Sequence, residues 1–173
     1  MNKVQKAVFL DRDGVINIDK AYVSKIDDFE FCEGVFETLF HFQSLGYLLI
    51  IVTNQSGIGR GYYSEEDFQT LMAWMQKELL HVNIKIDAIY HCPHAPEAQC
   101  ECRKPRSGML KEAIKTFHID VSQSWMIGDK PSDIEAALGA GITQTILLSR
   151  ELQNIKAKYC VNFLLDTINL IKQ

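Results

Sequence analysis

The sequence predicts an α/β fold in which helices flank a parallel sheet, because buried strand patterns alternate with helical patterns along most of the chain. Residues 47–52 (YLLIIV) form a near-continuous apolar run, which is typical of a parallel strand covered on both faces. Strands that alternate with helices imply right-handed crossovers within one sheet. We therefore expect a Rossmann-like parallel sheet with helices on its faces.

The predicted elements alternate in chain order. Strands are expected at 6–10, 47–52, 86–91, 124–127 and 143–148, and helices at 33–45, 64–80, 107–117, 131–140 and 162–171. Gly46 ends the first helix, Ser64 and Asp67 form a capping-box variant at the start of the second, and Pro131 suits the first turn of the fourth. The expected apolar contacts of the first two helices are Phe36, Leu39, Phe40 and Phe42, and Phe68, Leu71, Met72, Met75 and Leu79.

Length and composition indicate one globular domain over residues 1–173. The chain has 47% hydrophobic residues and a formal net charge of −4. It has no long run of Lys or Arg, so a broad nucleic-acid footprint is not expected. Neither a secretory segment nor an apolar stretch long enough to span a membrane is evident, so we expect a cytoplasmic protein without a membrane partner. Its five cysteines should then stay reduced unless they bind a metal.

Polar residues follow four of the predicted strands. They are Asp11 and Asp13, then residues 53–56 (TNQS), then Arg103 and Lys104 at the end of a loop, and finally residues 128–130 (GDK). Ligands of open α/β sheets bind outside the carboxyl ends of the strands. Four polar ends together therefore favour a phosphate or metal site over a merely solvated rim.

The first strand end carries groups suited to covalent phosphoryl transfer. Asp11 can bind Mg²⁺ through one oxygen and attack phosphorus with the other, and Asp13 can act as general acid and then base. Alone, such a pair more often marks a turn stabilised by aspartate side chains.

The other strand ends would complete the site. Thr53, followed by a glycine-rich turn, can hold an anion, and the Lys104 ammonium can neutralise charge on the transferring group. Asp129 would complete the magnesium site, and Arg103 and Lys130 could bind anionic groups of the substrate. For Asp133, a helix-capping role and a role in the site stay equally open.

The loop 92–105 contains a potential zinc site. Cys92, His94, Cys100 and Cys102 lie within eleven residues of one another and can close a tetrahedral zinc shell. Four protein ligands leave no open position, so such a zinc ion would be structural and would fix the loop that carries Arg103 and Lys104. The alternative is a chance cluster of free cysteines.

Taken together, these residues resemble the haloacid dehalogenase superfamily of phosphohydrolases, whose pattern is matched by residues 11–15 (DRDGV), Thr53, Lys104 and residues 128–129 (GD). More narrowly, the strings FLDRDGVIN, FEFCEGV, TNQSGIGRG, CPH, CECRKP and GDKPSDIEAA resemble the heptose bisphosphate phosphatases. The resemblance covers nearly the whole chain. It implies a haloacid dehalogenase fold with a minimal cap, so that loops shape the pocket and a monomer is expected.

The resemblance also implies roles for individual residues. Asp11 would be the nucleophile and Asp13 the acid/base, with Thr53 and Lys104 steadying the phosphoryl group. Asp11, Asp13 and Asp129 would bind Mg²⁺, Asp13 through its carbonyl oxygen, and the Cys/His cluster would bind structural Zn²⁺. The implied substrate contacts, with Arg60 as a further candidate for a second phosphate, are Asp19, Lys20, Ala21, Tyr22, Asn54, Gln55, Ser56, Arg103 and Lys130.

The implied reaction removes the C7 phosphate of D-glycero-D-manno-heptose 1,7-bisphosphate, a phosphorylated sugar, on the route to nucleotide-activated heptose for lipopolysaccharide or other surface glycans. One departure matters, because the segment between His94 and Cys100 is short, as in the related histidinol-phosphate phosphatases. The strings DKAYV and SGIGRG favour the heptose enzymes. Histidinol-phosphate hydrolysis remains the alternative, and a non-catalytic zinc module or a phosphotransferase are further hypotheses.

Overall fold

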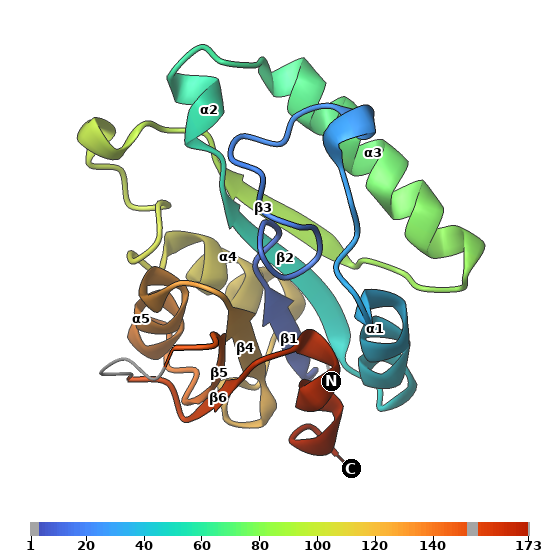
Figure 1. The fold of residues 1–173 in the computed structure, drawn as a ribbon. Coiled ribbons are helices and arrows are strands. Elements are labelled where there is room, and N and C mark those ends of the chain that lie inside the picture. Colours follow the sequence, from blue (N-terminus) through green and yellow to red (C-terminus); the bar gives the residue numbers. More distant parts are fainter. Residues whose placement is uncertain (1–3, 152–155, 173) are drawn as a thin grey trace.

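One six-stranded parallel sheet organises the computed structural model, which describes residues 4–151 and 156–172 (Figure 1). The strand order is β3-β2-β1-β4-β5-β6, and every neighbouring pair is parallel. The strands are β1 (Ala7–Leu10), β2 (Leu48–Asn54), β3 (Ala88–Cys92), β4 (Trp125–Gly128), β5 (Gln144–Leu148) and β6 (Tyr159–Val161). The predicted parallel sheet is confirmed, and β1 lies at its centre, where the strand order reverses.

Helices cover both faces of the sheet (Figure 1). On one face lie α1 (Val35–Ser44) and α3 (Glu65–His81), and on the other lie α4 (Gly108–Phe117) and α5 (Pro131–Gly139). The short helix α2 (Ser56–Gly59) follows β2 directly. Short 3-10 turns lie at Ile26–Asp28, Pro96–Ala98 and Val121–Gln123. None of the helices among the described residues is long and apolar enough to span a membrane.

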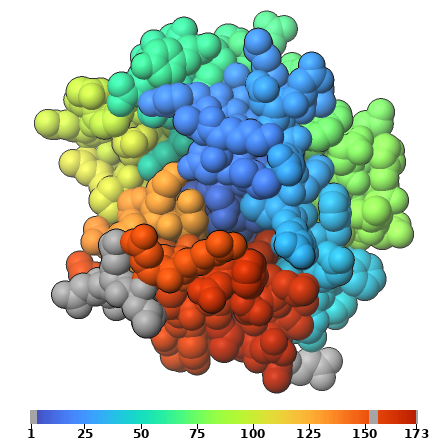
Figure 2. Space-filling model, in the orientation of Figure 1, coloured from blue at the N-terminus to red at the C-terminus, as the bar shows by residue number. Residues whose placement is uncertain are grey.

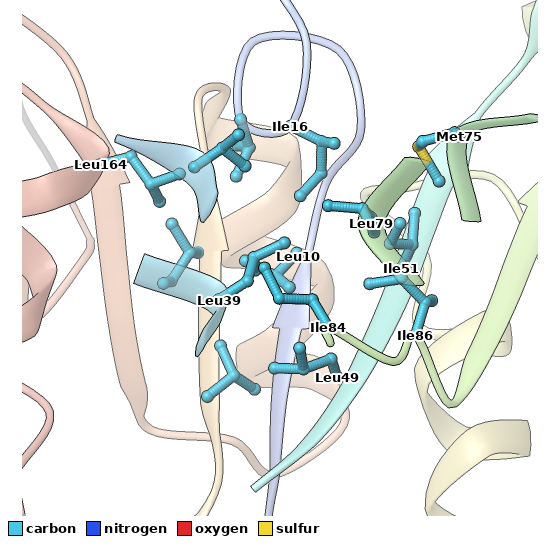
Figure 3. Close-up of a cluster of buried hydrophobic side chains, with 14 of the residues drawn as sticks. Leu10, Ile16, Leu39, Leu49, Ile51, Met75, Leu79, Ile84, Ile86 and Leu164 are labelled. Atoms are coloured by element: carbon cyan, nitrogen blue, oxygen red, sulfur yellow. The ribbon is translucent and has the colours of Figure 1, made fainter. Parts of the chain in front are cut away.

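Apolar side chains pack on both faces of the sheet. Along β1, Val8 and Leu10 join the cluster under α1 and α3, whereas Ala7 and Phe9 join the cluster under α4 and α5. Figure 3 shows the first cluster, in which Leu39 of α1 and Leu79 of α3 lie beside strand residues such as Leu10, Leu49 and Ile51. Because both faces are covered, the inner strands read as continuous apolar runs.

Helix α3 follows the prediction closely. Ser64 Oγ accepts a hydrogen bond from the Asp67 N–H at 3.0 Å, and Asp67 Oδ2 accepts one from the Ser64 N–H at 2.8 Å. This reciprocal pair is a complete capping box. The five predicted core residues of the helix are all buried, namely Phe68, Leu71, Met72, Met75 and Leu79.

Two predictions about helices are wrong. Phe40 and Phe36 of α1 are 52% and 36% exposed, because the buried stripe of that helix runs through Val35, Thr38, Leu39 and Phe42 instead. The closing α-helix expected at 162–171 is instead a shorter 3-10 helix, η4 (Leu164–Asn169), which follows strand β6. Leu164 and Ile171 are buried against α1, so apolar anchoring rather than helical periodicity fixes this segment.

The loop between β1 and α1 covers the carboxyl end of the sheet. In Figure 2 its blue residues occupy the middle of the displayed face, between the teal segment around α2 and the orange segment that begins α5. The side chains at the ends of β1, β2 and β4 therefore face a space that this loop helps to enclose.

Candidate active site

A cavity of about 500 Å³ lies at the carboxyl ends of the strands. The residues that line it come from the ends of β1 and β2, the loop after β1, α2 and the turn that follows it, the end of the Cys-containing loop and the start of α5. They are Asp11, Asp13, Asp19, Ala21, Tyr22, Asn54, Gln55, Ser56, Tyr63, Arg103, Lys104, Pro105, Lys130, Ser132 and Asp133. Four predicted polar segments that are far apart in the sequence thus meet at one site.

Asp11 lies at the end of β1 and is 5% exposed. Its Oδ1 accepts hydrogen bonds from the Arg12 N–H at 2.8 Å and from Lys104 Nζ at 3.0 Å. Burial raises the pKa of Asp11 to about 7; Lys104 opposes this rise, and the Asp133 and Asp129 carboxylates add to it. Because both contacts fall on Oδ1, no hydrogen bond from the described residues occupies Oδ2, which is available as ligand or nucleophile.

Lys104 is 3% exposed, and its ammonium has three partners. Nζ lies 2.6 Å from Asp133 Oδ1 and 3.0 Å from Asp11 Oδ1, and it donates to the Val52 carbonyl oxygen at 2.7 Å. Burial alone would lower the pKa of Lys104, but the two carboxylates outweigh it and raise the pKa. The ammonium is therefore charged and its three donors are satisfied.

Asn54 fixes the backbone that carries Lys104. Its Nδ2 donates to the Lys104 carbonyl oxygen at 3.1 Å, and its Oδ1 accepts from the Lys104 N–H at 3.0 Å. The amide predicted to touch substrate thus also ties the end of β2 to the loop 92–105.

Asp13 is held by three donors. Its Oδ1 accepts from Arg12 Nη2 at 2.7 Å and from Asn17 Nδ2 at 3.0 Å, and its Oδ2 accepts from Gln55 Nε2 at 3.0 Å. Arg12 is fully buried and also donates to the Val23 carbonyl oxygen at 2.7 Å, which ties the middle of the loop between β1 and α1 to its start. Arg12 was not among the predicted site residues, although its position between two aspartates was a signal.

The carboxylates of Asp11, Asp129 and Asp133 form an acidic cluster, with one oxygen of each within 4.8 Å of the others. Burial raises the pKa of Asp129 to about 6; Lys130 opposes this, and Asp133 and Asp19 add to it. Asp129 Oδ1 is buried and has no hydrogen-bond partner among the described residues. An orphaned carboxylate oxygen amid repelling carboxylates suits a hard divalent cation such as Mg²⁺.

This cluster differs from the expected ligand set in one member. The Asp13 carboxylate is not part of it, whereas Asp133 is. The resemblance implies that Asp13 contributes its backbone carbonyl oxygen, which is not a side-chain ligand and so is no member of this cluster.

Asp133 has both of the roles that the sequence left open. Its Oδ2 accepts from the N–H groups of Asp129 at 3.1 Å and Lys130 at 3.0 Å, which caps the start of α5. Its Oδ1 pairs with Lys104. A Cβ on Gly128 would overlap the Asp133 side chain, so a glycine at the end of β4 makes room for this arrangement.

The outer part of the cavity is more polar and more exposed. Lys130 Nζ lies 3.2 Å from Asp19 Oδ2, and Arg103 has a buried Nη1 without a hydrogen-bond partner among the described residues. Burial would raise the pKa of Asp19, but the Ala21 N–H and Lys130 lower it. The cavity rim thus offers cationic groups for an anionic ligand.

Four predicted residues of the phosphatase site lie outside the lining; one of them, Asp129, belongs to the acidic cluster described above. Thr53 is fully buried and its Oγ1 accepts from Gln55 Nε2 at 2.8 Å, so it lies just below the cavity floor. Lys20 pairs with Glu30 at 2.9 Å on the surface, and neither Lys20 nor Arg60 lines the cavity. Conversely, Tyr63, Pro105 and Ser132 line the cavity although no sequence motif pointed to them.

The four predicted zinc ligands meet in the loop 92–105. Cys102 Sγ lies 3.1 Å from Cys92 Sγ and 3.5 Å from Cys100 Sγ, and His94 Nδ1 lies 3.2 Å from Cys102 Sγ. Disulfide sulfurs would be about 2.05 Å apart. Sulfurs around one tetrahedral Zn²⁺ at about 2.3 Å would be separated by roughly 3.7 Å, which is close to these distances. The donor set and its spacing therefore fit a zinc ion.

Comparisons with known proteins agree with this geometry. A family model described as HAD-hydrolase-like matches residues 101–159. D-glycero-alpha-D-manno-heptose-1,7-bisphosphate 7-phosphatase of Campylobacter jejuni is 57% identical over 146 residues, with 84% of each chain covered. D-glycero-beta-D-manno-heptose-1,7-bisphosphate 7-phosphatase of Haemophilus ducreyi is 52% identical over 151 residues, with 83% of each covered.

A solved structure shows the same fold. D,D-heptose 1.7-bisphosphate phosphatase from B. bronchiseptica, complexed with magnesium and phosphate, is similar with a TM-score of 0.86 and 27% identity. The match covers 96% of this chain and 97% of that one.

Proposed function

This chain belongs to the heptose-1,7-bisphosphate 7-phosphatases of the haloacid dehalogenase superfamily, and from that premise we propose that it hydrolyses the C7 phosphate of D-glycero-D-manno-heptose 1,7-bisphosphate. The chain is a phosphatase. The observation that carries the proposal is the placement of Asp11 beside the charged Lys104 at the floor of a polar cavity, with an Oδ2 that accepts no hydrogen bond from the part of the chain that the structure describes.

The two half-reactions use different groups of the chain. Asp11 Oδ2 attacks phosphorus and forms an acyl phosphate, while the bond to the sugar oxygen breaks and Asp13 gives that oxygen a proton. A water molecule then attacks the phospho-aspartate; Asp13 takes its proton, phosphate leaves, and the Asp11 carboxylate is restored. Lys104 and Thr53 stabilise charge on the transferring group.

Mg²⁺ fits the acidic cluster, and we infer that Asp11, Asp129 and the Asp13 carbonyl oxygen would hold it, with Asp133 at its edge. When bound, the ion neutralises the phosphoryl oxygens and the carboxylates that repel one another. The unpartnered Asp129 Oδ1 supports this assignment.

Zn²⁺ is assigned a structural role in the same proposal. Its four ligands lie in the loop that ends at Arg103 and Lys104, so the ion would fix both cations relative to β2. Four protein ligands leave no position for substrate.

Arg103 and Lys130 are proposed to bind the anionic parts of the substrate that do not react. Both residues line the cavity. Arg103 Nη1 is a buried hydrogen-bond donor that has no acceptor among the described residues. A second phosphate on the sugar would supply one.

Parallel kinetics on both anomers of the heptose bisphosphate and on histidinol phosphate test the proposal. A kcat/KM for histidinol phosphate above that for both sugars would overturn the substrate assignment. Both anomers are assayed because the relative of 57% identity is named for the alpha anomer and the relative of 52% identity for the beta anomer.

The proposal also covers the domain organisation of the chain, its oligomeric state, its location and its pathway. The residues 1–173 are proposed to act as one phosphatase domain, as a monomer, in the cytoplasm, on the route to nucleotide-activated heptose. The near-complete coverage of relatives of similar length supports the first of these. Size-exclusion chromatography with light scattering tests the monomer.

A further inference from the structure

Tyr63 belongs to the cavity but has no part in the chemistry described above. Its side chain lines the cavity, and its hydroxyl donates a hydrogen bond to Gln55 Oε1 at 2.6 Å. Burial raises the pKa of Tyr63 to about 12, so the phenol keeps its proton at neutral pH.

Both polar atoms of the Gln55 side chain have hydrogen-bond partners. The residue is 2% exposed, and its Nε2 donates to Asp13 Oδ2 at 3.0 Å and to Thr53 Oγ1 at 2.8 Å. An amide nitrogen has two hydrogens, so both are used. The single acceptor that remains, Oε1, takes the hydrogen from Tyr63.

This pattern fixes which way the amide faces. If the amide turned over, Oε1 would face the Asp13 carboxylate, and two acceptors would oppose each other in a buried place. The Tyr63 hydroxyl stabilises the productive orientation by supplying Oε1 with its donor. Two groups assigned to the chemistry, Asp13 and Thr53, therefore depend on the same amide.

The Tyr63 ring is itself held in place. A Cβ on Gly57 would overlap the ring at Cε1 and Cζ, so the absence of a side chain in α2 makes room for it. The Tyr62 N–H also donates to the Gly57 carbonyl oxygen at 2.8 Å, which closes the loop between α2 and α3. The hydroxyl thus projects into the site from a packed turn.

We propose that Tyr63 is a positioning residue for phosphoryl transfer, which acts through Gln55 to orient the Asp13 carboxylate and the Thr53 hydroxyl. This inference rests on the proposed roles of Asp13 and Thr53. Tyr63 exchanges no proton with the substrate. Tyr63 holds the Gln55 amide, and that amide in turn holds Asp13. Loss of the Tyr63 hydroxyl should therefore disturb the geometry of the reacting groups more than the affinity for substrate.

A double-mutant cycle on the full-length, metal-loaded enzyme tests the proposal. The variants are Tyr63→Phe, Gln55→Met and the double variant, with kcat and KM measured on the preferred sugar bisphosphate. Tyr63→Phe leaves a buried acceptor without a partner, so we expect kcat to fall roughly 5- to 100-fold with KM changed less than about 2-fold. In the Gln55→Met background the same change should have no further effect on kcat.

Tyr62→Phe is the matched control, because its side chain is 60% exposed, and it should leave kcat unchanged. Equal kcat for Tyr63→Phe and the wild type would overturn the inference, as would a full additional loss in the Gln55→Met background. A rise in KM alone would assign Tyr63 to substrate binding and would also overturn it. Failure of the proposed function is seen separately, as a wild-type enzyme that hydrolyses neither sugar anomer.

Discussion

The Lys104 ammonium lies closer to Asp133 Oδ1, at 2.6 Å, than to the proposed nucleophile Asp11, at 3.0 Å. Asp133 also caps α5 through the N–H groups of Asp129 and Lys130. One carboxylate thus links the helix that follows β4 to the cation that faces the nucleophile. Because Lys104 and Asp133 are both buried, their attraction is little screened by solvent.

Asp133→Asn is predicted to lower both activity and stability. The amide oxygen can keep both backbone hydrogen bonds or the contact with Lys104, but not all three, and its NH₂ group would then face the ammonium or the two N–H groups. We expect the free energy of unfolding to fall by roughly 1–3 kcal/mol and kcat to fall by about 10-fold or more. Urea unfolding and steady-state kinetics measure the two effects.

Asp166→Asn is the matched control for that change. Asp166 Oδ2 accepts from the Phe163 N–H at the start of η4 but lies in no contact with Lys104. Asp166→Asn should lower the free energy of unfolding and leave kcat unchanged. Full activity in Asp133→Asn would show that its pairing with Lys104 does not matter for turnover.

Asp11→Asn is predicted to abolish turnover without unfolding the protein. The amide keeps Oδ1 as an acceptor for Arg12 N–H and Lys104 but is not a nucleophile, so phosphate release should fall by about 10³-fold or more. Burial raises the folded-state pKa of Asp11 to about 7, above its unfolded value, so its charge destabilises the metal-free fold at pH 8. The variant should therefore be as stable as the wild type, or more so, without Mg²⁺.

Phosphate release and urea unfolding at pH 8 measure these outcomes, with the exposed Asp28→Asn as control. Retained release of phosphate by the Asp11 variant would rule out the aspartyl-phosphate route.

The order of the elements and the meeting of polar strand ends could be predicted from the sequence, because apolar runs and chain order carry that information. The positions of Thr53 and Lys104 near the cavity could be predicted because the first follows a recognisable strand and the second follows the Cys/His motif, and their catalytic roles stay predictions. The role of Asp133 could not be decided, because it depends on the distance to Lys104 across the sheet. Tyr63 was missed for the same kind of reason, since its contact with Gln55 depends on how α2 turns the chain. The exposure of Phe40 was missed because two apolar stripes were possible on α1.

Cys100→Ser is predicted to reduce zinc content and stability together. A hydroxyl is a poor zinc ligand, and three remaining donors would leave an open position. We expect substoichiometric zinc by elemental analysis and a lower midpoint of unfolding, with kcat reduced because Arg103 and Lys104 follow the cluster directly. Cys160→Ser is the matched control, because Cys160 lies in β6 away from the cluster and should keep one zinc per chain. Full zinc occupancy in the Cys100 variant would refute the ligand set.

The capping box of α3 makes a prediction about stability and pH. Hydrogen bonds from the N–H and the hydroxyl of Ser64 hold the pKa of Asp67 below its usual value of 3.8. A carboxyl with a lowered folded-state pKa contributes stability that is present above the unfolded pKa of about 4 and is lost as the pH falls through the folded value. Ser64→Ala should therefore lower the free energy of unfolding, and it should do so more at pH 7 than at pH 3.

Asp67→Asn should remove this pH dependence, because its side chain does not titrate. The exposed Glu66→Gln, in the same helical turn, should leave it unchanged. Urea unfolding curves at pH 7, 5 and 3 for the three variants and the wild type provide the measurement. A cost of Ser64→Ala that stays constant from pH 7 to 3 would mean that Ser64 stabilises the helix through the Asp67 N–H alone, independently of the Asp67 charge. The kcat of all three variants should equal that of the wild type, since Ser64, Glu66 and Asp67 do not line the cavity.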